Sequence, residues 1–281
     1  MLAPRPGCQH YLLPPLCRYC YVINFAPSLV VFDLDGTAID SHPNRATSNN
    51  LTGAISRLRR AGIHVCAATG RSASSMLSEE AVAHLGLDSY AVVSGGGAIL
   101  DVSLGVILEE VPIPIPVSYQ LFQLLLPHNF DSYFVNDYPE DLFLEGGSPL
   151  EYDPRASWYF IGLARVPDAL AQDLAHQIRL IGGISVVVTR GRFTGTRELH
   201  ITSSNATKNH ATRRIQALLG VNREQSVAIG DGHNDVDLFR AVAYRVAMGN
   251  AVRPLKDIAD EVIGPVSEDS LARFLLTIPT Q

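Results

Sequence analysis

Short apolar runs alternate with segments of helical periodicity from residue 29 onward. Uninterrupted apolarity is typical of strands that are buried on both faces of a parallel sheet. The runs that show it are LVVF at 29–32, IHVCAAT at 63–69, YAVVS at 90–94 and SVAIG at 226–230. Over 51–61, apolar residues recur at the spacing of one helix face. This alternation predicts an α/β fold with a doubly wound, mostly parallel sheet.

A different pattern occupies residues 98–195. Alternating and aromatic segments such as SYFVND and WYFIGLA predict strands, and two helices are expected around 119–126 and 169–181. The segments PIPIP and GGSP interrupt them. The pattern predicts an α+β domain inserted into the α/β layer, with residues 29–97 and 196–281 forming the core on either side of it.

Residues 1–28 lack either pattern, and we expect a loosely ordered leader there. Its apolar residues are interrupted by prolines and an arginine, which is not typical of a signal peptide. Cys8, His10, Cys17 and Cys20 leave a zinc site open as an alternative, because the last two form a CxxC pair.

Composition narrows the class of protein. The 281 residues are 47% hydrophobic and 18% charged, and the formal net charge is −6 with no cluster of basic residues. These values favour a globular protein without a nucleic-acid partner. Four cysteines are too few for a disulfide framework, and no apolar run is long enough to cross a bilayer. We therefore expect a soluble cytoplasmic protein, monomeric or homodimeric, with a small-molecule substrate and no membrane partner.

Polar residues follow several of the predicted strands directly. Because ligands of open α/β sheets bind beyond the carboxyl ends of the strands, these residues are expected to meet at one edge. They are Asp33 and Asp35, Thr69, Ser94, and the acidic segment from Asp231 to Asp235. A turn or a helix cap would explain each set alone, but not the four sets together.

The spacing of Asp33 and Asp35 suits phosphoryl transfer. Residues two apart at the end of a strand can face the same cavity, so one carboxylate can attack phosphorus while the other exchanges a proton with the leaving oxygen. Carboxylates gathered without His or Cys favour Mg²⁺, which offsets their mutual repulsion. Thr69 and Lys208 are the candidates for holding the phosphoryl oxygens.

The segments DLDGT, ATGR, a lysine near a helix start, and GDGHND occur in this order. Together they resemble the four motifs of the haloacid dehalogenase (HAD) superfamily of phosphohydrolases. The long insertion before the lysine resembles the cap of the Cof-type branch. The resemblance extends over about residues 29–276 and implies a HAD-like Rossmannoid core with an inserted α+β cap.

The resemblance also implies roles for individual residues. It makes Asp33 the nucleophile and Asp35 the general acid and base. Mg²⁺ would be held by Asp33, by Asp231 and by the backbone carbonyl of Asp35, while Asp235 orients this site. The expected substrate-binding residues are Thr69, Gly70, Lys208 and Asn234. The implied activity is Mg²⁺-dependent hydrolysis of a small phosphorylated metabolite, such as a sugar phosphate, through an aspartyl phosphate.

The chain departs from the family pattern at two places. Cof-type proteins usually carry Asn-Gly where this chain has Gly96 and Gly97, and a glycine after the lysine where it has Asn209. Asp237 and His233 match no family site, and we expect them on the surface.

Other functions remain open. A phosphomutase would use the same chemistry, and a phospho-accepting signalling domain also carries an aspartate at a strand end. The signalling domain is disfavoured because it is shorter and lacks the paired aspartates of the first strand. A dehalogenase would lack Asp35, and a catalytically silent binding protein would leave the site unused. The insertion would select the leaving group, and its candidate contacts are Tyr133, Asn136, Tyr138, Trp158 and Arg190.

Overall fold

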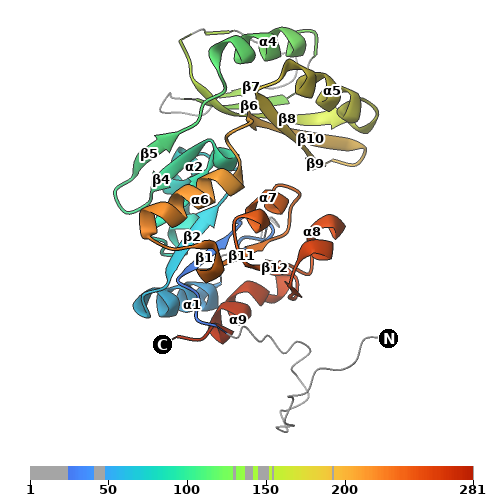
Figure 1. Cartoon of the computed structure of the whole chain (residues 1–281). Coiled ribbons are helices and arrows are strands. Elements are labelled where there is room, and N and C mark those ends of the chain that lie inside the picture. Colours follow the sequence, from blue (N-terminus) through green and yellow to red (C-terminus); the bar gives the residue numbers. More distant parts are fainter. Residues whose placement is uncertain are drawn as a thin grey trace.

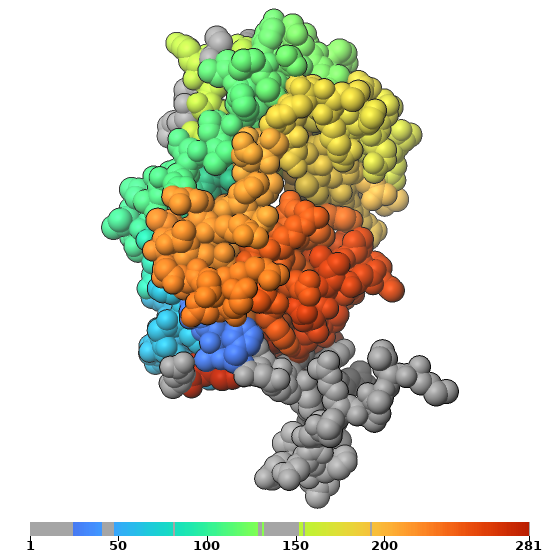
Figure 2. Space-filling model, viewed as in Figure 1, coloured from blue at the N-terminus to red at the C-terminus, as the bar shows by residue number. Residues whose placement is uncertain are grey.

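The computed structural model describes residues 25–40, 48–128, 131–136, 142–144, 152–153, 155–191 and 193–280. Residues 1–24 of the expected leader, with its possible zinc ligands, therefore lie outside the described residues, whereas the ring of Phe25 contacts Tyr244 and the N–H of Ser28 donates to Gln225. Among the residues described, no helix is long and apolar enough to cross a membrane. Figure 1 shows two parts, a larger sheet with helices around it and a smaller sheet that carries two helices on its far side. In the space-filling view of Figure 2, the two parts touch along one side of the molecule.

The larger part is built on an eight-stranded sheet, which confirms the predicted fold class. Its strands are parallel except for the last two of the spatial order, which run antiparallel to their neighbours. The spatial order is β13 (Glu261–Val262), β12 (Tyr244–Ala247), β11 (Ser226–Gly230), β1 (Leu29–Phe32), β2 (His64–Ala68), β3 (Tyr90–Val93), β4 (Ala98–Asp101) and β5 (Val106–Glu110).

Helices cover both faces of this sheet. The chain leaves the centre of the sheet in both directions, and right-handed crossovers then place the connecting helices on opposite faces. Accordingly, α1 packs against α9 and α6 packs against α7. The helices are α1 (Asn49–Arg60), α2 (Ala73–Ser78), α3 (Glu80–Ala83), α6 (Lys208–Leu219), α7 (Asp235–Arg240), α8 (Arg253–Ile258) and α9 (Ser270–Thr277).

The first helix illustrates how the sequence forms these elements. Ser48 precedes α1 and accepts a hydrogen bond from the backbone N–H of Asn50, which caps the helix start. The residues at helical spacing form one buried face, namely Leu51, Ala54, Ile55 and Leu58. Between β2 and β3 the chain forms two short helices, α2 and α3, because Glu79 between them is extended.

The order of strands joins segments that are far apart in the sequence. β11 lies beside β1 in parallel register, with Phe32 opposite Ile229. The carboxyl ends of the two strands therefore reach the same edge of the sheet, and the residues that follow them, beginning with Asp33 and Asp231, become neighbours.

The smaller part, which we call the cap, contains an antiparallel five-stranded sheet. Two helices, α4 (Ile115–Leu125) and α5 (Asp168–Ile181), supply Leu121, Leu125, Leu174 and Ile178 to a separate hydrophobic cluster. The spatial order of the strands is β7 (Leu142–Leu144), β6 (Asp131–Asn136), β8 (Trp158–Pro167), β10 (Thr196–Ser203) and β9 (Ile184–Arg190).

The strand pairing differs from the expected domain limits of 98–195. β4 and β5 return antiparallel beside β3, so residues 98–110 belong to the larger sheet, whereas β10 pairs with β8 and β9 in the cap. The sequence does not distinguish the two assignments, because a short apolar run such as AILD can form a buried strand in either sheet. Val111 bonds to Gly97 of the core and Ile113 to Trp158 of the cap. We propose that the cap extends from about residue 112 to residue 206.

Candidate active site

The loop after β1 carries the two aspartates of DLDGT. The backbone N–H of Asp33 donates to the carbonyl oxygen of Ile229 at 3.0 Å, which continues the pairing of β1 with β11 beyond the strands. Gly36 turns the loop with φ of +81°, and a Cβ there would lie 2.3 Å from Oδ2 of Asp231. Only glycine permits this close approach, so the glycine of DLDGT brings the two loops together.

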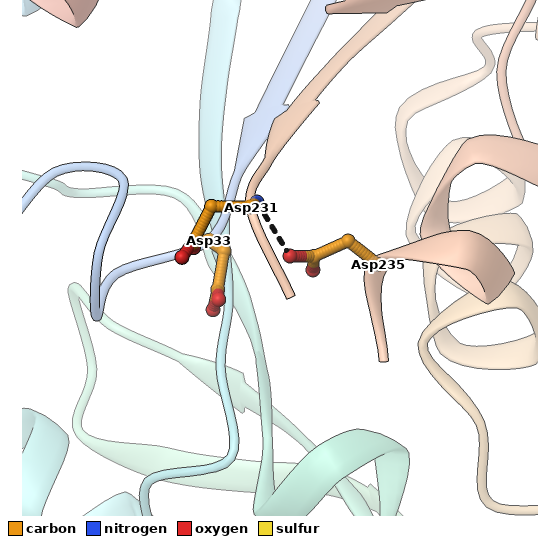
Figure 3. A group of neighbouring side chains, drawn as sticks. All are labelled: Asp33, Asp231 and Asp235. Carbon is orange, nitrogen blue, oxygen red and sulfur yellow. Dashed lines mark hydrogen bonds between the residues drawn. The ribbon is translucent and has the colours of Figure 1, made fainter. Parts of the chain in front are cut away.

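Three carboxylates meet at this edge. Asp33, Asp231 and Asp235 each offer an oxygen within 4.8 Å of the others (Figure 3). Oδ2 of Asp235 accepts hydrogen bonds from the backbone N–H groups of Asp231 at 2.9 Å and Gly232 at 2.8 Å. Oδ1 of Asp231 accepts from the hydroxyl of Thr37 at 2.9 Å. The loop after β11 is thus folded around the Asp235 side chain.

Lys208 supplies the positive charge in contact with this group. It is the first residue of α6 and only 2% exposed, and its Nζ lies 2.9 Å from Oδ1 of Asp33 and 2.8 Å from Oδ1 of Asp235. Burial lowers the pKa of its ammonium group, but the two carboxylates more than offset this and the pKa is raised. Lys208 is therefore held in its charged form.

One lysine does not balance three carboxylates. Burial, together with the charge of Asp235, raises the pKa of Asp33 well above its usual range and that of Asp231 to about 7. Charges taken out of water are stable only when they are paired. The group therefore has an excess of negative charge that a divalent cation would neutralise.

The donor set fits Mg²⁺. The group consists of carboxylate oxygens, which are the ligands that a hard cation prefers. Asp235 already accepts three hydrogen bonds, which suits a residue that orients the site more than a ligand. Asp33, Asp231 and the backbone carbonyl of Asp35 would then hold the ion. Asn250 donates to Oδ2 of Asp231 at 3.3 Å and steadies it.

The Asp35 carboxylate makes a contact that the sequence did not predict. The guanidinium group of Arg71 donates to both of its oxygens, at 2.9 Å and 2.7 Å. Arg71 also pairs with Glu79, the extended residue between α2 and α3. These hydrogen bonds raise the pKa of Arg71, so its charge is permanent. Arg71 fixes the position of Asp35. In the sequence, the signal for this contact was the position of Arg71 directly after the segment ATG.

The other residues predicted for the site, or discussed beside it, differ in their burial and in their contacts. Thr69 is fully buried, and its hydroxyl accepts from the N–H of Arg71 at 3.1 Å. Gly70 faces open space, and Asn234 is partly exposed at the start of α7. His233 is exposed, and Asp237 pairs with Arg240 on the helix surface. The structure thus brings Asp33, Asp231, Asp235 and Lys208 into contact and leaves His233 and Asp237 outside this group.

The two positions that depart from the family pattern, Gly96 and Asn209, lie in different surroundings. Gly96 has φ of +112°, and a Cβ there would lie 2.4 Å from the backbone carbonyl carbon of Thr207. No side chain fits at this position, so the absent asparagine follows from the close packing of this loop on the start of α6. Asn209 accepts from Arg213 one turn later and faces away from Lys208.

Two of the proposed leaving-group contacts are placed by the structure. Trp158 is buried in the hydrophobic cluster of the cap, and Arg190 is exposed at the end of β9. The side chains of Tyr133 and Asn136, and all of Tyr138, lie outside the described residues.

Comparison with known proteins identifies the family. A family model described as haloacid dehalogenase-like hydrolase matches residues 30–143 and 167–275, and the chain belongs to this family. The membership confirms the resemblance seen in the four motifs.

Individual relatives agree with this assignment. Pyridoxal phosphate phosphatase YbhA of Escherichia coli is 26% identical over 88% of this chain and 97% of its own length. 5-Amino-6-(5-phospho-D-ribitylamino)uracil phosphatase YitU of Bacillus subtilis is 25% identical over 89% of this chain and 96% of its own. The solved structure of a haloacid dehalogenase-like hydrolase from B. subtilis superposes with a TM-score of 0.77 and 20% identity, over 90% of this chain and all of that one. The expected enzyme class, a phosphatase of this superfamily, is confirmed.

Proposed function

We propose that the protein is a Mg²⁺-dependent phosphomonoester hydrolase that acts on a small phosphorylated metabolite through an aspartyl phosphate. The observation that carries the proposal is the contact of the buried Asp33 carboxylate with Lys208, next to Asp231. The names of the relatives support a phosphorylated small molecule as substrate, and YitU acts on one with a ribityl chain.

The first step forms a bond between Asp33 and phosphorus. A carboxylate oxygen of Asp33 attacks the phosphoryl group, the bond to the alcohol oxygen breaks, and Asp35 gives that oxygen a proton. Lys208 and Thr69 steady the phosphoryl oxygens as charge shifts onto them. When bound, Mg²⁺ supplies charge neutralisation at the same phosphoryl group.

The second step returns the enzyme to its starting state. Asp35, now a carboxylate, takes a proton from water, the water oxygen attacks phosphorus, and the bond to Asp33 breaks with release of phosphate. When Asp35 carries the proton for the first step, one of its two oxygens is released from Arg71, and the remaining hydrogen bond keeps the carboxyl group in place. The cap excludes bulk water and contacts the alcohol part of the substrate.

An aryl phosphate assay tests this proposal. Phosphate release should require Mg²⁺ and should fall at least about 1000-fold in Asp33→Asn. Asp237→Asn is the matched control, because the same change on the surface of α7 disturbs the pair with Arg240 and leaves the catalytic edge intact. Equal activity of wild type and Asp33→Asn would show that Asp33 is not the nucleophile. A phosphorylated protein that accumulates and persists would favour the signalling function instead.

A further inference from the structure

A cavity lies at the edge of the larger sheet opposite the catalytic edge. Its volume of about 530 Å³ is within the range of cavities that bind small molecules. β2 begins at His64, which lines the cavity, and ends one residue before Thr69. At roughly 3.3 Å per residue, His64 and Thr69 are about 16 Å apart along the strand. Figure 1 shows α1, which forms one wall, at the end of the larger part away from the cap, so the cavity is separate from the proposed active site.

Three segments enclose this cavity. α1 contributes Ser56, Arg59 and Arg60, whose spacing places them on one side of the helix. The apolar residues of α1 that pack into the core lie on another side. The other lining residues come from the turn after α1, the start of β2 and the segment before β3, and they are Gly62, Ile63, His64, Val65, Asp88 and Ser89. Because a Cβ on Gly62 would meet no atom within 4 Å, the turn leaves this space open.

Positive charge exceeds negative charge in the cavity. Arg59 is ion-paired with Asp88, and it also donates to the carbonyl oxygen of Gly86. In the part of the chain that the structure describes, no carboxylate pairs with Arg60, and Asp88 is the acidic residue among those that line the cavity. A bound anion would therefore complete the pairing of Arg60, whose guanidinium group does not lose its charge in proteins.

Other hydrogen-bond donors accompany Arg60. The hydroxyl of Ser89 accepts from the Sγ–H of Cys66 at 3.7 Å, so its own hydrogen can be donated to a further group. Ser56 supplies a second hydroxyl from α1, and His64 supplies an imidazole from β2. Donors thus line the cavity on all three of its walls.

We propose that this cavity is a second binding site, for a small organic molecule that carries a phosphate group. A guanidinium group binds phosphate through two parallel hydrogen bonds, which assigns the phosphate to Arg60. The donors of Ser56, His64 and Ser89 suit the several oxygens of a phosphate better than the two oxygens of a carboxylate. The volume leaves room for an organic part beside the phosphate. This inference goes beyond the proposed function and does not depend on it.

The test follows the imidazole signal of His64 by nuclear magnetic resonance, with His64→Gln used to assign it. The probes are inorganic phosphate and the phosphonate analogue of glycerol phosphate, whose carbon–phosphorus bond is not an ester. Both should shift the signal of His64, and the phosphonate should bind at least about threefold more tightly. Arg60→Gln should weaken the binding of both about tenfold. Because Arg60 is exposed at the last position of α1, this change leaves the core intact.

Two further variants separate charge from space. Arg213→Gln is the matched control, because Arg213 is an exposed arginine of α6 that does not line the cavity, and affinity at His64 should not change. Ser56→Leu keeps every charge and narrows the cavity. It should therefore weaken the phosphonate more than inorganic phosphate.

Four outcomes would overturn the proposal. They are an unchanged His64 signal, equal affinity of wild type and Arg60→Gln, phosphate that binds as tightly as the phosphonate, and an equal shift of the exposed His176 in the cap, which would indicate adventitious surface binding. Since the signal of His64 reports on this cavity, the result does not depend on whether Asp33 is the nucleophile. The aryl phosphate assay tests that role separately.

Discussion

Replacing Lys208 by Met should destabilise the protein strongly, with or without substrate. Lys208 is 2% exposed, and its Nζ lies within 2.9 Å of two carboxylates. Removing one partner of a buried ion pair typically costs about 3–5 kcal/mol, because a buried charge is left uncompensated. The free energy of unfolding of an ordinary domain is about 5–15 kcal/mol, so we expect a loss of roughly a fifth of it or more.

Adding Asp235→Asn to Lys208→Met should restore part of the lost stability. An asparagine oxygen can still accept from the N–H groups of Asp231 and Gly232, while the carboxylate charge next to position 208 is gone. The double variant Lys208→Met/Asp235→Asn removes one positive and one negative buried charge. It should therefore be more stable than the sum of the two single losses predicts. Groups in one such network couple by about 0.5–3 kcal/mol.

The assay is urea-induced unfolding followed by circular dichroism, with a chelator present so that no cation replaces the lysine. Lys256→Met is the matched control, since Lys256, the other lysine of the chain, donates to a neutral acceptor, the carbonyl oxygen of Gly249. Its loss should cost about 1 kcal/mol. If Lys208→Met costs no more than this control, or if the single losses add in the double variant, the charge argument is wrong.

Three further predictions follow from other contacts. Gly96→Ala should cost about 3 kcal/mol in urea unfolding, because its Cβ would meet Thr207 at a φ of +112°; unchanged stability would contradict this packing. Arg71→Met should lower kcat for an aryl phosphate about 10- to 100-fold with little change in KM, because Asp35 loses both hydrogen bonds; a change in KM alone would assign Arg71 to binding. Burial raises the pKa of Cys66 to about 12. In a variant without the other cysteines, a thiol reagent should therefore modify Cys66 at the rate of unfolding, and rapid modification of the folded protein would contradict its burial.

The sequence predicts the fold class because buried parallel strands are apolar throughout. Such runs mark where each strand ends, and residues at those ends must share one edge once the strand order is given. The pattern of apolar runs therefore places Asp33 and Asp231 at one edge of the sheet, and the pairing of β1 with β11 in the structure makes them neighbours. Their roles in catalysis, like those of Thr69, Gly70 and Asn234, stay predictions.

Other features depend on tertiary contacts that a pattern does not contain. Whether β4 joins the larger sheet or the cap is decided by its pairing partner, because its apolar run AILD would suit a buried strand in either sheet. The contact of Arg71 with Asp35 depends on where a loop after β2 passes a loop after β1. The restriction at Gly96 arises from the backbone at Thr207, which is distant in the sequence. These are contacts between loops, and loops carry the weakest periodic signal.

The connection from the cap to α6 bears on how the proposed catalytic edge and the cap are joined. Ser204 donates to Gly183 of the cap, and the hydroxyl of Thr202 donates to the carbonyl oxygen of Ala206, so the first part of the connection is bonded to the cap. Thr207 instead caps α6 through its hydroxyl and packs on Gly96 of the core. The change of partner falls between residues 206 and 207, immediately before the catalytic lysine of the proposal. Lys208 therefore keeps its distance to the nucleophile through contacts of the core alone, and substitutions on the cap face should alter which alcohol is accepted while the phosphoryl group is held as before.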